Sequence, residues 1–192
     1  KLRCDVIDPS VLEVKLITVP RFGDERGYFS EVYSGARYRE LGINLQFVQD
    51  NHSHSAAAGT VRGLHFQTPP FAQDKLVRVG RGAILDVAVD IRHGSPTFGR
   101  AVAAVISAAL SNQLLIPAGF AHGFCTLEAD TDVYYKASNY YSAEHDCGIA
   151  WNDPALGIAW PVSPECAVLS AKDRAWRTLA ETPLCFTYSN AK

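Results

Sequence analysis

The sequence predicts a mainly β protein with the architecture of a sandwich or barrel, and three observations support this. Short apolar segments of strand length follow one another through most of the chain. Turn-forming residues separate them, as in VGRG at 79–82, HGSP at 93–96 and PAG at 117–119. Apolar residues alternate with Asp86 and Asp90 over 85–91, which predicts a strand with one buried and one polar face.

The expected strands, in chain order, span residues 11–19, 27–33, 45–52, 60–67, 75–79, 83–91, 101–106, 113–116, 122–127 and 132–138. Two short helices are predicted at 34–41 and 172–179. The sequence becomes irregular after WNDP at 151–154. We expect this tail to pack on the same domain, anchored by Trp151, Trp160 and Trp176.

Composition and charge narrow the class of protein. A chain of 192 residues with 47% hydrophobic content predicts one domain over residues 1–192. The net charge of -2 gives no general attraction to nucleic acid. The longest apolar run, residues 101–110, is too short to cross a bilayer, so no membrane segment is expected. Five widely spaced cysteines without a Cys-x-x-Cys pair argue against disulfides and structural zinc and favour the reducing cytoplasm.

Two short segments carry most of the chemical information. VRGLHFQ at 61–67 and LSAKD at 169–173 supply Arg62, His65, Lys172 and Asp173. An imidazole titrates near neutrality, so it can take a proton and return it. Strand alternation places His65 and Gln67 on one face, which is more typical of a polar barrel lumen than of an apolar core. These groups suit proton transfer beside a carbonyl on a negatively charged substrate.

A metal site is the sharpest alternative. His52 and His54 share one strand face, and with His122 they would supply three imidazoles for Zn, Fe or Mn. However, SAAAG at 55–59 provides no nearby carboxylate after His54. We therefore predict that the protein binds no metal, and we keep metal binding as the alternative hypothesis.

A series of motifs resembles the dTDP-4-dehydrorhamnose 3,5-epimerase family in both order and spacing. The match begins with DERGYFSE at 24–31, FVQDNHS at 47–53, VRGLHFQ at 61–67 and KLVRV at 75–79. It continues with DVAVDIR at 86–92, PAGFAHGF at 117–124, Tyr135 with Lys136, WNDP at 151–154 and LSAKD at 169–173. The resemblance covers about residues 14–179, which is nearly the whole chain.

The resemblance implies a cupin fold, a double-stranded β-helix jelly roll with short helices mostly toward the C-terminus. It further implies a homodimer that exchanges N-terminal segments, needs no metal or other cofactor, and binds a dTDP-linked 4-keto-6-deoxyhexose. By the match, His65 is the catalytic base, Asp173 its carboxylate partner, and Tyr135 the proton donor on the opposite face of the sugar. Lys75 matches the lysine near the C4 oxygen.

The implied reaction converts dTDP-4-keto-6-deoxy-D-glucose to dTDP-4-keto-L-rhamnose by inversion at C3 and C5. The protons on C3 and C5 both flank the C4 ketone, so removal of either leaves negative charge on the same oxygen. One oxyanion site can therefore serve both inversions, and Lys75 would stabilise the enolate.

Further residues match substrate-binding positions of the family. Arg26 and Arg62 match residues that contact the diphosphate, a role that suits bidentate guanidinium groups. The positions around the nucleoside are Phe29, Glu31, Gln49 and Tyr141, of which Phe29 and Glu31 would act across the dimer. Asn51 and His122 match positions near the sugar, and Lys172 joins the substrate-binding set.

Two other functions remain open from the sequence. One is a related enzyme that inverts C3 or C5 alone, or that acts as a ketoisomerase, on a nucleotide-linked 4-keto-6-deoxy sugar. The other is a non-epimerase cupin that binds a metal through His52, His54 and His122. His54 also departs from many relatives, which have Arg or another residue there, and is expected to alter contacts at the pocket mouth.

Overall fold

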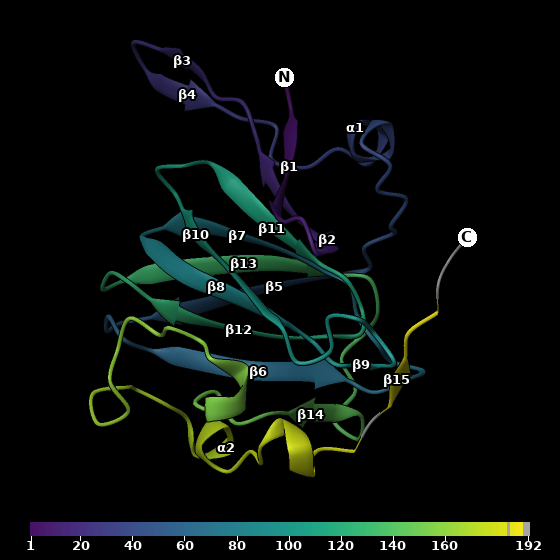
Figure 1. The fold of residues 1–192 in the computed structure, drawn as a ribbon. Coiled ribbons are helices and arrows are strands. Elements are labelled where there is room, and N and C mark those ends of the chain that lie inside the picture. Colours follow the sequence, from purple (N-terminus) through teal and green to yellow (C-terminus); the bar gives the residue numbers. More distant parts are fainter. Residues whose placement is uncertain (184, 190–192) are drawn as a thin grey trace.

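The computed structural model describes residues 1–183 and 185–189, and it confirms the predicted mainly β architecture. A six-stranded sheet with the order β1-β2-β11-β7-β13-β5 faces a five-stranded sheet with the order β10-β8-β12-β6-β14 (Figure 1). All neighbouring strands within these two sheets are antiparallel. No helix in the described ranges is long and apolar enough to cross a membrane.

The strands of the six-stranded sheet are β1 (Arg3–Asp8), β2 (Val11–Thr18), β5 (Gln49–Ser55), β7 (Lys75–Arg81), β11 (Asn112–Ile116) and β13 (Thr131–Ala137). Those of the five-stranded sheet are β6 (Val61–Gln67), β8 (Ala83–Asp90), β10 (Ala101–Ser107), β12 (Phe120–Thr126) and β14 (Asp146–Gly148). The smaller pairs join β3 (Phe22–Asp24) to β4 (Gly27–Phe29) and β9 (Arg92–His93) to β15 (Phe186–Thr187). The helices are α1 (Gly35–Glu40) and α2 (Ala171–Arg174), with 3-10 turns at Pro154–Leu156 and Leu179–Glu181.

The main hydrophobic core lies between the two sheets. Val77 and Val133 of the six-stranded sheet pack with Ala88 and Phe124 of the five-stranded sheet, and all four are buried. A second cluster covers the outer face of the five-stranded sheet, where Leu64, Val87 and Val89 meet the C-terminal segment through Ile149, Leu156 and Leu179. The five-stranded sheet is therefore buried on both faces.

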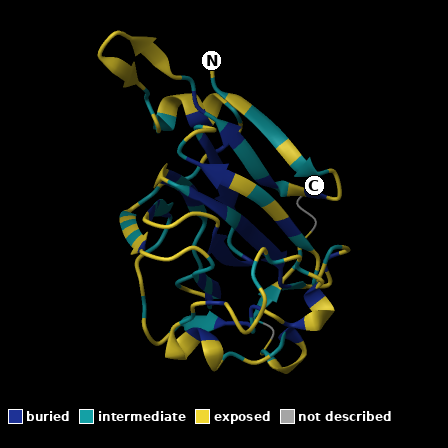
Figure 2. Ribbon diagram, turned by 90° about the vertical axis from the view of Figure 1, so that its left-hand side faces the viewer, coloured by how far each residue is buried: buried dark blue, intermediate teal, exposed yellow. Residues whose placement is uncertain are grey.

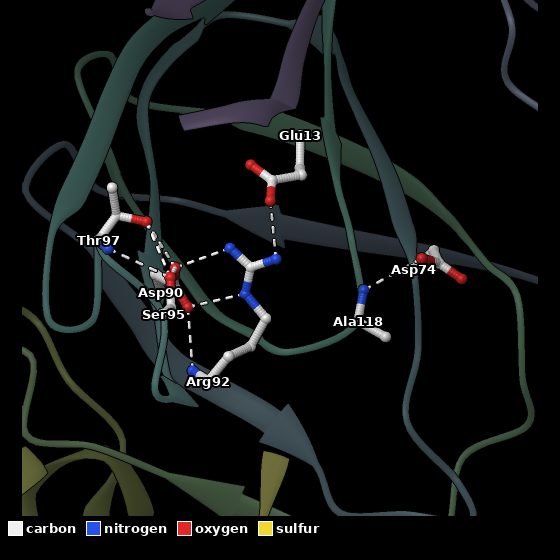
Figure 3. Close-up of polar contacts among 7 residues, drawn as sticks. All are labelled: Glu13, Asp74, Asp90, Arg92, Ser95, Thr97 and Ala118. Atoms are coloured by element: carbon white, nitrogen blue, oxygen red, sulfur yellow. Dashed lines mark hydrogen bonds and ion pairs between the residues drawn. The ribbon is translucent and has the colours of Figure 1, made fainter. Parts of the chain in front are cut away.

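This double burial corrects the expectation that β8 has one buried and one polar face, because both faces are buried. Asp86 and Asp90 point away from the odd-numbered residues as predicted, yet both carboxylates are 0% exposed. Burial of a charge requires hydrogen-bonding partners. Asp90 accepts from the backbone and guanidinium of Arg92 and from the hydroxyls of Ser95 and Thr97, and Arg92 also bonds Glu13 (Figure 3). This network holds the β8–β9 turn and ties it to β2.

A bulge in β6 sets the direction of the polar side chains at the centre of that strand. The register with β12 shifts between His122 and Phe124, which brings Arg62 and His65 onto the same inner face although they are three residues apart. Gly63 lies at this bulge with φ of +119°. An added Cβ there would lie 2.6 Å from Gly123 Cα, so only glycine fits.

The N-terminal region departs most from the sequence-based expectations. Strand β1 was not predicted, and the strand expected over 27–33 ends at Phe29 because β4 is one arm of a short hairpin with β3. The hairpin projects away from the two sheets (Figure 1) and is largely exposed (Figure 2). The strand expected over 45–52 instead runs from Gln49 to Ser55, and the helix expected over 172–179 is the shorter α2. Helix α1 is confirmed within one residue at each end of the prediction.

Candidate active site

A polar cavity of about 270 Å³ opens between the two sheets beside α2. Seven of the thirteen predicted site residues line it: Arg62, His65, Lys75, His122, Tyr135, Lys172 and Asp173. Ser53, Phe124 and Ser170 complete the wall. The cavity is slightly smaller than the roughly 300–1,000 Å³ that encloses a drug-sized ligand. It therefore suits a sugar ring, with any attached nucleotide lying outside.

His65 and Asp173 form a hydrogen-bonded pair at this cavity. His65 lies on β6 and Asp173 on α2, and the Nε2 atom of His65 contacts Asp173 Oδ1. An ionised carboxylate only accepts hydrogen bonds, so Nε2 donates to it and Nδ1 is the nitrogen left to take a proton. Burial alone would raise the pKa of Asp173, but the hydrogen bonds from His65 and Ser170 hold it below its ordinary value. The pair therefore provides a histidine base backed by a buried, ionised carboxylate.

Ser170 and Trp176 support this pair, and neither was identified as a site residue from the sequence. The Ser170 hydroxyl donates to Asp173 Oδ2 at 2.9 Å and accepts from the Asp173 backbone N–H at 3.0 Å, which caps α2. The Ser-x-x-Asp spacing is the signal that could have identified this cap. Trp176 was expected only to anchor the tail, but its ring lies edge-on to His65 with centroids 6.3 Å apart.

Lys75 and Tyr135 approach the cavity from the opposite sheet. They lie on β7 and β13, and the Lys75 ammonium is 5.9 Å from the centre of the Tyr135 ring. Burial lowers the pKa of Lys75 to about 8, against the opposing effect of Asp146 and Asp86. Burial also raises the pKa of Tyr135, helped by the charge of Asp146. At neutral pH this wall presents an ammonium and a protonated phenol.

His122 forms a second, deeper pair with Asp86. Its Nε2 atom lies 2.7 Å from Asp86 Oδ1, and both side chains are buried. Burial lowers the pKa of His122 despite the adjacent carboxylate, so the ring is neutral near pH 7. With Nε2 donating to Asp86, Nδ1 is the remaining acceptor of the ring. The sequence placed Asp86 on the polar face of its strand, opposite the face expected to be buried, whereas Asp86 is itself buried.

Gln49, Asn51 and Tyr141 form a connected group, and Tyr141 links it to the cavity wall. Gln49 Nε2 donates to Asn51 Oδ1 at 3.0 Å, and Gln49 Oε1 accepts from the Tyr141 backbone at 2.9 Å. The Tyr141 hydroxyl donates to Asp146 Oδ2 at 3.0 Å, and Lys172 bonds the same oxygen. Asp146 therefore joins Tyr141 to the cavity wall. No local pattern in the sequence pointed to Asp146.

In a single copy of the chain, the remaining three predicted residues do not line the cavity. Arg26 bonds Asp24 inside the β3–β4 hairpin, and Glu31 forms an ion pair with Arg37 at 3.1 Å. Phe29 is 70% exposed. A single copy of the chain does not bring Arg26, Phe29 and Glu31 to His65.

The three histidines of the metal alternative do not converge. His52 and His54 share a strand face as expected, but they contact Asp132 of β13, each at 3.0 Å, while His122 lies in the cavity. Among the residues that the structure describes, no group of three His, Cys, Asp or Glu side chains is arranged to hold a metal ion. His54 is also not a wall residue of the cavity, and it contributes only its backbone carbonyl to Arg62.

We compared the sequence and the fold with those of known proteins. Residues 9–181 match the family described as dTDP-4-dehydrorhamnose 3,5-epimerase. A dTDP-4-dehydrorhamnose 3,5-epimerase of Sinorhizobium fredii is 56% identical over 179 residues, which cover 93% of this chain and 91% of the relative.

Two solved structures share both sequence and fold with the chain. The dTDP-4-dehydrorhamnose 3,5-epimerase of Bacillus anthracis, with TDP and PPi bound, is 50% identical with a TM-score of 0.87, covering 92% of this chain and 99% of its own. The dTDP-6-deoxy-D-glucose-3,5-epimerase of Legionella pneumophila, in complex with dTDP-4-keto-L-rhamnose, is 44% identical with a TM-score of 0.92, covering 98% and 100%. The chain therefore belongs to the dTDP-4-dehydrorhamnose 3,5-epimerase family and is an isomerase.

Proposed function

We propose that this enzyme inverts C3 and C5 of dTDP-4-keto-6-deoxy-D-glucose through an enolate, with His65 as base and Tyr135 as acid. The observation that carries the proposal is that these two residues enter one cavity from opposite sheets. Inversion requires a proton to leave one face of the sugar and another to arrive on the other face. A base and an acid on opposing walls meet that requirement.

The charges of the cavity fit each step. Nδ1 of His65 removes the proton from C5 or C3, and Asp173 stabilises the imidazolium that forms. Negative charge then develops on the C4 oxygen, where the Lys75 ammonium stabilises it. Tyr135 remains protonated because its pKa is raised, so its phenol can deliver a proton to the enolate. Neutral His122, which donates to Asp86, can accept a hydrogen bond from a sugar hydroxyl.

The rest of the substrate would extend out of the cavity. Arg62 is held by the His54 carbonyl at 2.9 Å and by Ser55, and its guanidinium suits the diphosphate. Tyr141, Gln49 and Asn51 would contact the nucleoside and the sugar. Tyr141 is exposed, which leaves its ring free to stack on a base.

We propose a homodimer in which the β3–β4 hairpin of one copy reaches the cavity of the other. The hairpin exposes Phe22, Tyr28 and Phe29 by 59%, 59% and 70%, a concentration of aromatic surface typical of an interaction site. In this arrangement Arg26, Phe29 and Glu31 would complete the partner's nucleotide site. The proposed compartment is the cytoplasm, which fits the five unpaired cysteines.

The reaction is tested by incubating the protein with dTDP-4-keto-6-deoxy-D-glucose in deuterated water and locating label by NMR. We expect deuterium at both C3 and C5. His65→Ala should abolish exchange, whereas Tyr135→Phe should retain exchange and lose inversion. Tyr134→Phe is the matched control, because Tyr134 stacks on His52 rather than lining the cavity. Label at one carbon alone would select the mono-epimerase, and no label in folded protein would reject both.

The shared site is tested by co-expressing His65→Ala with Arg26→Ala. Each variant alone should be severely impaired. Half of randomly assorted dimers are mixed, and each mixed dimer has one intact site, so about one quarter of wild-type activity should return. Recovery of no activity in confirmed mixed dimers would show that each chain forms its own complete site.

A further inference from the structure

Ser53 carries a buried hydroxyl without a hydrogen-bond partner in the described part of the chain. It belongs to the inner face of β5, where the neighbouring polar side chains are paired. Asn51 accepts from Gln49 at 3.0 Å, and Ser55 accepts from Arg62 at 3.3 Å. Leaving a buried hydroxyl unpaired costs about 1–3 kcal/mol, so such groups call for an explanation.

The place of Ser53 in the cavity points to a ligand as the missing partner. Ser53 lines the same cavity as Arg62 and Tyr135. Arg62 is bound to the next two residues of β5, through the His54 carbonyl and the Ser55 hydroxyl. Ser53 is the residue opposite Val133 on β13, two positions before Tyr135. It therefore lies on the wall between the group proposed to bind the diphosphate and the proposed acid.

The chemistry of the substrate limits what can meet this hydroxyl. In a 4-keto-6-deoxyhexose, C1 carries the diphosphate, C4 is the ketone and C6 is a methyl group. C3 and C5 exchange protons with His65 and Tyr135. C3 also carries a hydroxyl, but inversion at C3 changes its direction, so it does not keep one partner through the reaction. The C2 hydroxyl is next to C1, takes no part in the reaction, and can both donate and accept a hydrogen bond.

We infer that the Ser53 hydroxyl binds the C2 hydroxyl of the hexose and makes this enzyme selective for sugars that retain that group. The inference rests on the proposed function, because the proposed function sets the orientation of the sugar in the cavity. A serine hydroxyl has one donor and two acceptor positions, so it pairs with a sugar hydroxyl in either sense. Because a site that pairs with a hydroxyl is left unsatisfied by an analogue lacking it, 2-deoxy sugars should bind more weakly.

Binding measurements separate this contact from turnover. Titration calorimetry would compare dTDP-glucose with dTDP-2-deoxyglucose, neither of which has the ketone needed for proton exchange. We expect the wild-type protein to bind dTDP-glucose about three- to tenfold more tightly than the 2-deoxy compound. Ser53→Ala should weaken dTDP-glucose binding by the same factor and bind both compounds equally.

Ser111→Ala provides the matched control, because Ser111 also has a buried hydroxyl without a partner among the described residues but lies outside the catalytic cavity. It should keep the wild-type preference, and melting temperatures would show that all three proteins are folded. Three results would overturn the inference: no preference in the wild type, a preference that survives in Ser53→Ala, or equal weakening of both compounds. Failure of deuterium exchange with an intact C2 preference would instead reject the proposed function alone.

Discussion

Replacing Asp173 by asparagine removes one negative charge from the dyad and leaves its shape unchanged. The carboxylate is 5% exposed and has two side-chain donors, His65 Nε2 at Oδ1 and the Ser170 hydroxyl at Oδ2. The substitution therefore removes the charge of the hydrogen-bond partner of His65 without opening a cavity. We expect it to slow removal of the substrate proton.

The size of this effect follows from the two hydrogen bonds. A charge-assisted bond to the imidazolium contributes about 1.5–3 kcal/mol more than water would. An asparagine must also turn its NH₂ group toward His65 or Ser170. The amide can keep its oxygen on Nε2 if Ser170 accepts from the NH₂ group, but the Ser170 O–H then loses the oxygen to which it donates, at a cost of about 1 kcal/mol. Together these losses predict a decrease in rate of about 10² to 10³ for Asp173→Asn.

The assay is the initial rate of deuterium incorporation at C5 by NMR, with the melting temperature measured on the same samples. Ser170→Ala removes the hydroxyl bond to Oδ2 and the cap of α2 but keeps the carboxylate on His65, and it should slow exchange between about twofold and tenfold. An Asp173→Asn protein that is fully folded and within fivefold of the wild-type rate would refute the proposed dyad.

Three further predictions concern other parts of the molecule. The pKa of Lys75 is lowered to about 8, so the rate of exchange should fall above pH 8 as the ammonium loses its proton. Lys75→Arg should shift this decrease in rate to higher pH. Asp90→Ala leaves Arg92 with Glu13 as its remaining carboxylate and removes the acceptor of the Ser95 and Thr97 hydroxyls. It should cost about 3–5 kcal/mol, or about 6–20 °C in calorimetric melting temperature. Gly63→Ala places a Cβ 2.6 Å from Gly123 Cα and should cost about 1–3 kcal/mol in urea unfolding; an unchanged midpoint would contradict the bulge geometry.

Much of the sheet structure could be predicted because burial repeats along each strand. From Lys75 onward, glycine turns and alternating side chains place the longer strands close to their observed ends, whereas the short strands β9, β14 and β15 were not predicted. The N-terminal strand β1 lacks such a signal because it is an edge strand with no fully buried residue. The end of β4 depends on where the hairpin meets the rest of the molecule, which local propensity does not encode.

In the candidate site, too, some features could be predicted from the local sequence and others could not. His65 and Gln67 could be placed on one face from alternation alone, but Asp173 is 108 residues from His65 and was paired with it only through the family resemblance. Asp86 was assigned to the correct side of β8 and to the wrong environment, because alternation does not reveal whether a second layer covers a sheet. The contacts of Asp146 arise from strand pairing between β14 and β6, which no local pattern predicts.

The arrangement of the proposed base and acid on separate sheets has a consequence for stereochemical accuracy. The distance between them depends on the width of the core, where Ala88 packs between the sheets with Val77 and Val133. A larger side chain at position 88 would push the sheets apart without touching the sugar. A reaction intermediate would then more often regain its proton from the side that lost it. In this enzyme the ratio of inverted to unchanged product should therefore respond to the volume of buried aliphatic side chains.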